Sequence, residues 1–252
     1  MLLLRYPASS RSTRCAHLKH CRPRQTRYLV DVSTLPAEAK AHAAATLRTV
    51  GITLLDCPII GTSAQAYGRD VVVCASGPKP AVEAVKCVLD AFSKRVEYVG
   101  KLGAGANMKL VANHLVPVHN AATAEAITLA QRLGIDPEMA VDILSGTGAG
   151  SRQLELRGPM MALGTYKPMT ATIATFIKDV DLITELAHSA NSPAPLLNTA
   201  AHLYRTANDN GFGGHDSSAI HAVYSGLSQH DVRQAGISDP RPRPEGIAHA
   251  QQ

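Results

Sequence analysis

Short apolar runs alternate with longer amphipathic segments between residues 28 and 102. The apolar runs predict strands at 28–32, 52–55, 70–75 and 96–99. The amphipathic segments predict helices at 36–50 and 79–93. Pro36 falls in the first turn of the earlier helix, where a missing N–H costs little, and Gly51 follows the end of that helix. Strands that alternate with helices are typical of an α/β sheet.

From residue 103 onward the pattern predicts helices and no strand. The longest predicted helix covers 107–133 and is closed by Gly134, and Asp136 is expected to cap the next one. Further helices are predicted at 136–144, 153–161, 173–190, 195–208 and 217–227. The second part of the chain is therefore expected to be an all-α domain, with much alanine-rich helix surface to cover.

Composition narrows the class of protein. The chain has 252 residues, of which 45% are hydrophobic and 18% charged, as is usual for a soluble globular protein. No apolar run approaches the roughly 18 residues that a membrane-spanning helix needs. The net charge is +5, but the first 30 residues hold seven Lys and Arg and no acidic residue, which leaves about −2 for the rest. The sequence thus predicts neither a membrane nor a nucleic-acid partner.

Residues 1–27 form a basic leader whose hydrophobic residues follow neither a helical nor a β-strand periodicity. It could be a transit peptide, an arm that binds DNA or a membrane, or translation that is not evolved sequence; we favour the last and expect the leader to be disordered. Residues 228–252, with three prolines, are also expected to be disordered. Five cysteines without framework spacing favour a reducing, cytoplasmic location, and no metal site is predicted.

Lys109 and Asn113 carry the most specific chemical signal. A glycine-rich turn, Gly103–Gly105, precedes the long predicted helix, and the two residues lie four apart on one face of that helix. An ammonium beside a carboxamide suits a substrate with a hydroxyl or carbonyl oxygen, because one group can exchange a proton while the other fixes the oxygen. The alternative is a surface lysine and a solvated asparagine.

Four segments in order along the chain together resemble the β-hydroxyacid dehydrogenase family. They are Asp31–Pro36, Asp56–Ala66, Gly103–Asn113 and Phe176–Leu182. The family includes 3-hydroxyisobutyrate, tartronate semialdehyde, glyoxylate and L-threonate enzymes and belongs to the 6-phosphogluconate dehydrogenase superfamily. The resemblance implies a partial Rossmann-like α/β sheet followed by an all-α domain. It also implies an NAD(P)-binding part at 28–102 and a helical part at 103–227.

The resemblance also implies roles for particular residues. Lys109 would be the catalytic lysine and Asn113 would hold the substrate, whose carboxylate would lie at the loop of Gly61 and Thr62. The cofactor, NAD or NADP, would contact three residues, namely Thr34, Lys178 and Asp179. The helical domains of this family pair between subunits, which implies a homodimer or homotetramer. The expected reaction interconverts a short β-hydroxy acid and its semialdehyde or keto form by hydride transfer.

Two departures from the family pattern support a second hypothesis for the function. The sequence has no Gly-x-Gly-x-x-Gly turn, the usual seat of the cofactor pyrophosphate, so we expect the phosphate-binding half of the Rossmann domain to be missing. Ile60 stands where the family places a serine that binds the substrate carboxylate. The chain could therefore be an impaired enzyme, or a non-catalytic module for helical dimerisation or small-acid binding.

Overall fold

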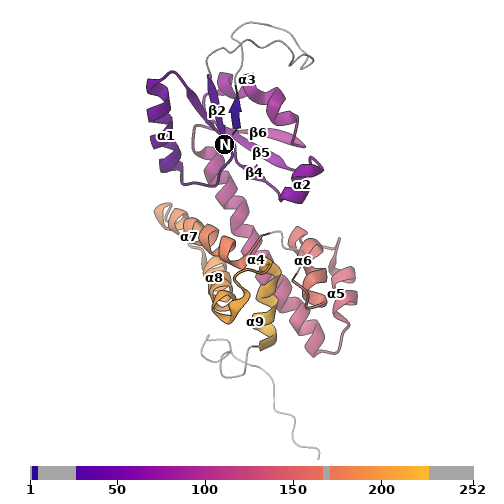
Figure 1. The fold of residues 1–252 in the computed structure, drawn as a ribbon. Coiled ribbons are helices and arrows are strands. Elements are labelled where there is room, and N and C mark those ends of the chain that lie inside the picture. Colours follow the sequence, from indigo (N-terminus) through magenta and orange to yellow (C-terminus); the bar gives the residue numbers. More distant parts are fainter. Residues whose placement is uncertain (1, 5–26, 167–170, 227–252) are drawn as a thin grey trace, which may run out of the picture.

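The structure is a computed structural model and describes residues 2–4, 27–166 and 171–226 (Figure 1). The expected disorder of the leader and of the tail at 228–252 therefore falls on residues outside the described ranges, apart from Leu2–Leu4 and Arg27. Leu2–Leu4 form strand β1, which pairs antiparallel with β2. The leader sequence gave no reason to expect that strand.

The α/β part holds a mixed sheet. Its strands are β1, β2 (Tyr28–Asp31), β3 (Thr53–Asp56), β4 (Ile59–Ile60), β5 (Val72–Ser76) and β6 (Arg95–Gly100). Parallel pairing joins β2 to β3 and β5 to β6, whereas β5 runs antiparallel to β3 and β4. Helix α1 (Ala37–Thr49) connects β2 to β3, and α3 (Lys79–Asp90) connects β5 to β6. These elements confirm the strands and helices predicted between residues 28 and 102.

Buried aliphatic side chains hold this sheet to its helices. Val30, Leu55 and Val73 of the strands are fully buried, and Val85 and Leu89 of α3 pack against the same cluster. Two short elements were not predicted: β4 and the helix α2 (Ser63–Tyr67) both lie in the stretch of small residues that follows β3. Their brevity explains the omission, because neither is long enough to show a hydrophobic period.

A long helix, α4 (Ala104–Arg132), leaves the sheet and runs through the helical part of the molecule (Figure 1). Around it lie α5 (Pro137–Leu144), α6 (Arg152–Ala162), α7 (Ile173–Ser189), α8 (Pro195–Ala207) and α9 (Ile220–Gly226). A π-helical turn (Asn208–Phe212) and a 3₁₀ turn (Ser217–Ala219) complete this part. Asp136 caps α5 as predicted, because its carboxylate accepts the amide of Glu138 at 2.8 Å.

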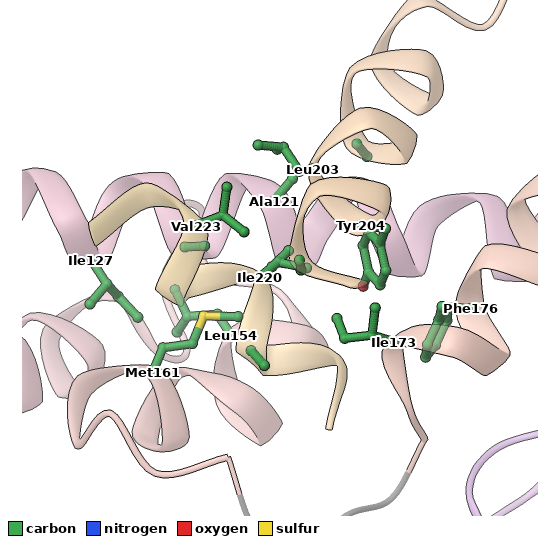
Figure 2. Close-up of a cluster of buried hydrophobic side chains, with 14 of the residues drawn as sticks. Ala121, Ile127, Leu154, Met161, Ile173, Phe176, Leu203, Tyr204, Ile220 and Val223 are labelled. Carbon is green, nitrogen blue, oxygen red and sulfur yellow. The ribbon is translucent and has the colours of Figure 1, made fainter. Parts of the chain in front are cut away.

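The core of the helical part lies where α4, α6, α7, α8 and α9 meet. Figure 2 shows Ile127, Met161 and Ile220 converging from three of these helices, and all three side chains are fully buried. Asn120 of α4 is also fully buried and donates to the hydroxyls of Tyr204 at 2.8 Å and Ser217 at 3.2 Å. These bonds link α4 to α8 and to the 3₁₀ turn from within the core.

The start of α4 is fastened to the ends of two strands. Asp56 and Ser76 are register partners at the ends of β3 and β5, and both are fully buried. The Asp56 carboxylate accepts the Ala106 amide at 2.8 Å, and the Ser76 hydroxyl accepts the Gly105 amide at 3.0 Å. The first amides of a helix have no hydrogen-bond partner within that helix. In α4 these amides are capped by strand residues that are distant in the sequence.

Gly105 makes this fastening possible because the backbone of α4 passes very close to both strands. A Cβ atom at Gly105 would lie 2.6 Å from the carbonyl oxygen of Cys74 and 2.8 Å from that of Asp56. Backbone atoms cannot swing aside as a flexible side chain can. The start of the helix would therefore have to move away from the strand ends to accept any larger residue.

We expect Gly105→Ala to lower the free energy of unfolding by about 1–3 kcal/mol through this overlap. Helix propensity alone favours alanine over glycine by about 1 kcal/mol, so the sign of the change separates the two effects. Denaturant unfolding measures it. Gly148→Ala, in a turn, is the control for an added methyl group with free space around it, because a Cβ there meets nothing within 4 Å. Equal or greater stability of Gly105→Ala would contradict the close approach.

Candidate active site

Lys109, Asn113 and Asp179 come together where α4 lies against α7. The Asn113 amide nitrogen donates to the Asp179 carboxylate at 2.8 Å, and Asn113 is buried. Lys109 lies one turn before Asn113 on α4 and interacts electrostatically with Asp179. Residues 66 positions apart are thus joined in one group. The sequence predicted that Lys109 and Asn113 share a helix face, but nothing in their spacing predicts that Asp179 faces them.

Burial and neighbouring charges tune the protonation of this group. Burial lowers the pKa of Lys109 from its usual value, although the nearby Asp179 and Cys74 oppose that shift. Burial raises the pKa of Asp179, against the opposing effects of the Asn113 hydrogen bond, Lys109 and Lys178. Both shifts bring the two groups closer to neutral pH, which suits proton exchange with a bound hydroxyl.

Asn113 is oriented by the bond that it donates. One of its amide N–H groups donates to Asp179, and this bond fixes the orientation of the side-chain amide and of its carbonyl oxygen. That oxygen can accept a hydrogen bond from a hydroxyl group. Lys178, the neighbour of Asp179, is exposed and is therefore available to a ligand that approaches from solvent.

Thr34 belongs to a tight turn after β2. Within this turn the Asp31 carboxylate accepts both the amide of Ser33 at 2.9 Å and its hydroxyl at 2.7 Å. Burial would raise the pKa of Asp31, but the bonds from Ser33 and the nearby Lys40 prevail and hold it below the usual value. Thr34 itself is half-buried. The turn is thus fixed by its neighbours, and the Thr34 hydroxyl is not needed to hold it.

Gly61 and Thr62 lie between β4 and α2. Gly61 has a φ of 140°, and a Cβ there would lie 2.6 Å from a methyl group of Val71, so only glycine fits. The Thr62 amide donates to the Gln65 side chain at 2.9 Å, while the Thr62 hydroxyl accepts the Gln65 amide at 3.3 Å. This is a reciprocal capping box. The Thr62 amide is already engaged, which does not favour the expected capture of a carboxylate by that N–H.

Ile60 pairs with Val72 in the ladder between β4 and β5 and is half-buried.

Within the described residues, no group of three His, Cys, Asp or Glu side chains is placed to hold a metal ion. In the same part of the chain, no helix is both long and apolar enough to cross a membrane.

Comparison with known proteins decides the family. The NAD binding domain of 6-phosphogluconate dehydrogenase matches residues 4–100, and the NAD-binding domain of NADP-dependent 3-hydroxyisobutyrate dehydrogenase matches residues 103–224. L-Threonate dehydrogenase of Pectobacterium atrosepticum is 34% identical over 81% of this chain and 67% of its own length. The chain belongs to the 3-hydroxyisobutyrate dehydrogenase-like family of β-hydroxyacid dehydrogenases.

Other relatives agree with this assignment. The chloroplastic glyoxylate/succinic semialdehyde reductase 2 of Arabidopsis thaliana is 31% identical over 76% of this chain and 53% of its own length. The crystal structure of 3-hydroxyisobutyrate dehydrogenase from Salmonella typhimurium superposes with a TM-score of 0.73 at 31% identity, covering 78% of this chain and 69% of that one. The predicted fold class, a partial Rossmann-like sheet followed by a mostly helical part, is confirmed by this likeness.

The matching domains identify NAD or NADP as the cofactor class of the family. The chain spans about two thirds of the length of the curated relatives that it matches, with 67%, 65% and 66% for three L-threonate dehydrogenases. Thr34, expected at the nicotinamide side of the cofactor, and Lys178, expected to contact the cofactor, both have some exposed surface. The Gly-x-Gly-x-x-Gly turn that seats the pyrophosphate in Rossmann domains does not occur in this sequence.

We expect Asp179→Asn to lower the pKa of Lys109 further, because the carboxylate favours the protonated ammonium. The folded-state pKa of Lys109 already lies below its unfolded value, so its protonation opposes folding. This penalty is complete below the folded-state pKa, decreases as the pH rises above it, and is gone above the unfolded-state pKa. Side-chain NMR of ¹³C-labelled lysine, assigned with Lys109→Arg, measures the change. Asp181→Asn is the control, because Asp181 lies on the same helix as Asp179 but forms an exposed ion pair with Arg205 of α8. An unchanged or higher pKa of Lys109 in Asp179→Asn would contradict the electrostatic contact.

Proposed function

We propose that this protein is an NAD(P)-dependent oxidoreductase that interconverts a short β-hydroxy acid and its semialdehyde or keto form by hydride transfer. The observation that carries the proposal is the group formed by Lys109, Asn113 and Asp179. It combines a lysine of lowered pKa with an oriented amide beside it. The relatives support the substrate class, because L-threonate, glyoxylate and succinic semialdehyde are all short acids.

In this proposal Lys109 exchanges a proton with the substrate oxygen. Its lowered pKa lets it take the proton during oxidation and return it during reduction. Asn113 holds the same oxygen by donating its second amide N–H, and Asp179 orients Asn113 by accepting the first. When bound, NAD(P) would supply the hydride chemistry. Asp179 therefore helps to hold the substrate through Asn113, and it also adjoins Lys178, the lysine expected to contact the cofactor.

The two ligands would be held by separate parts of the fold. Thr34 and Lys178 would contact the nicotinamide end of the cofactor, one from the turn after β2 and the other from the exposed side of α7. The loop of Gly61 and Thr62 would enclose the substrate carboxylate. Both the amide and the hydroxyl of Thr62 donate to the Gln65 side chain, at 2.9 and 3.2 Å, so the Gln65 side chain would have to turn away for either group to bind the carboxylate.

A second function is favoured by one specific observation. Ile60 offers no hydrogen bond at the position where the family places a serine that binds the substrate carboxylate. A non-catalytic module that dimerises or binds a small acid would keep the fold without this contact.

We also propose that the chain is organised as an NAD(P)-binding part at 28–102 and a helical part at 103–227. The end of β6 at Gly100 and the start of α4 at Ala104 support this boundary. A reducing, cytoplasmic location is supported by Cys57 and Cys74, which are buried free thiols.

We propose further that the helical part pairs with a second copy of the chain. Large apolar side chains are exposed at the end of α4 and on the adjoining α5: Leu129, Leu133, Met139 and Ile143. Exposed apolar residues gathered on neighbouring elements are typical of an interface. A homodimer or homotetramer would cover them.

The proposed reaction is tested by titrating the full chain with NADH and NADPH and assaying a panel of short semialdehydes and β-hydroxy acids. We expect cofactor binding and turnover, with kcat in Lys109→Ala reduced by roughly 10²-fold or more, since a general acid–base group contributes about 10²–10⁴-fold. Lys178→Ala should instead weaken cofactor binding. Binding of a small acid without turnover under any condition would favour the non-catalytic module.

Oligomeric state is tested by light scattering after size exclusion. We expect a mass of two or four times the 26.6 kDa of one chain. Leu133→Glu combined with Met139→Glu should give the single-chain mass, because both side chains are exposed on the proposed interface. Tyr67→Glu replaces an even more exposed residue of α2 in the α/β part and should leave the oligomer intact. A single-chain mass for the unmodified protein would contradict the pairing.

A further inference from the structure

Lys40 of α1 is a buried cation with an unusual set of partners. Its side chain is fully buried, and its ammonium donates to the Asp56 carboxylate at 2.5 Å and to the carbonyl oxygen of Ser33 at 2.7 Å. The carboxylate of Asp31 lies 3.6 Å from the same nitrogen. A buried ammonium is very costly without such partners, so all three acceptors help to keep Lys40 in this place.

The bond to Ser33 connects Lys40 to the cofactor side of the proposed site. Ser33 precedes Thr34 in the turn after β2, and Lys40 holds the carbonyl of that turn directly. Asp31 holds the amide and the hydroxyl of Ser33 from the other side. The position of Thr34 therefore depends on the place of the Lys40 ammonium, although Lys40 lies on a different element.

The bond to Asp56 connects Lys40 to the start of the helix that carries Lys109. One oxygen of Asp56 binds Lys40, and the other accepts the Ala106 amide at 2.8 Å in the first turn of α4. Lys109 follows three residues later, and helical side chains point back toward the N-terminus of their helix, here over the turn that Asp56 holds. A shift of that turn would move Lys109 relative to Asp179 and Cys74, its charged and titratable neighbours on α7 and β5.

Charge balance explains why one lysine can serve both sides. The Lys40 ammonium and the partial positive charge at the start of α4 together face the two carboxylates of Asp31 and Asp56. Loss of the ammonium would leave the buried Asp56 carboxylate and the partly buried Asp31 carboxylate without the cation that both face. We expect both the turn and the helix start to respond to such a change, and not one alone.

We infer that Lys40 is a positioning residue: through Ser33 and Asp56 it fixes the Thr34 turn and the start of the Lys109 helix relative to each other. Lys40 itself is fully buried and touches neither substrate nor cofactor in this account. The inference rests on the proposed function for the roles of Thr34 and Lys109. The physical coupling of the two segments can be measured whether or not the chain is active.

Hydrogen exchange of the full-length protein tests the coupling in Lys40→Met, Lys40→Arg and the control Lys86→Met. Lys86 forms an exposed pair with Asp90 on α3, so its loss should change neither segment. In Lys40→Met we expect exchange to become at least about tenfold faster both at 33–34 and at 105–106, while the amides of α3 keep their protection. If Lys40→Met does not fold, Lys40→Arg, which keeps the charge, should still speed up exchange at both places.

Two further readouts separate positioning from general stability. The NMR titration of Lys109 should move toward the usual lysine value in the Lys40 variants, because a loosened helix start admits water to the ammonium. In an active chain, kcat should fall about tenfold or more with little change in KM, as expected for misplaced catalytic groups. Lys40→Arg should recover part of the loss.

Unchanged exchange at both segments in a folded Lys40 variant would overturn the inference, as would loss of protection at only one of them. If the unmodified chain shows no turnover, the proposed function fails but exchange and the Lys109 titration still decide the coupling. If the unmodified chain is active and Lys40→Met keeps its kcat, the proposed function stands and the positioning role is wrong.

Discussion

The structure depends on how α4 begins. This helix runs from the sheet through the helical part and carries both Lys109 and Asn113, so its first turn sets the place of the proposed chemistry relative to the sheet (Figure 1). Gly103, which precedes it, offers no side chain to cap it. The ends of β3 and β5 supply the missing acceptors through Asp56 and Ser76, and Lys40 balances the charge of Asp56. These acceptors from distant segments bond the first turn of α4 to the sheet, which a local cap would not do.

The elements could be predicted from sequence because each has a local signal. The strands from residue 28 onward carry apolar runs, and the capped helices carry residues such as Asp136 that mark their ends. Elements without such a signal were missed: β1 lies in a basic leader, and β4 and α2 are too short for a period. The register of β3 against β5, which brings Asp56 beside Ser76, is a tertiary feature that no local pattern contains.

The candidate site shows the same division. A shared helix face follows from the spacing of Lys109 and Asn113, and the resemblance to the family added Thr34, Gly61, Thr62, Lys178 and Asp179 as proposals. The bond between Asn113 and Asp179 could not be predicted from sequence, because it depends on how α7 packs on α4. Lys40 had no signal at all, because in sequence it is one polar residue on an alanine-rich helix whose other residues are mostly exposed. Its burial becomes visible only when Asp31 and Asp56 are seen at neighbouring strand ends.

The central claim is that this fold transfers hydride between a nicotinamide and a short acid. Isotope transfer tests it most directly: the full chain is incubated with NADH or NADPH carrying deuterium on either face of C4 and with a panel of short semialdehydes, and the acids are analysed by mass spectrometry. Our account predicts that one face delivers its deuterium to the carbon that bears the new hydroxyl. No label in any acid from either cofactor, although the protein is folded, would contradict it.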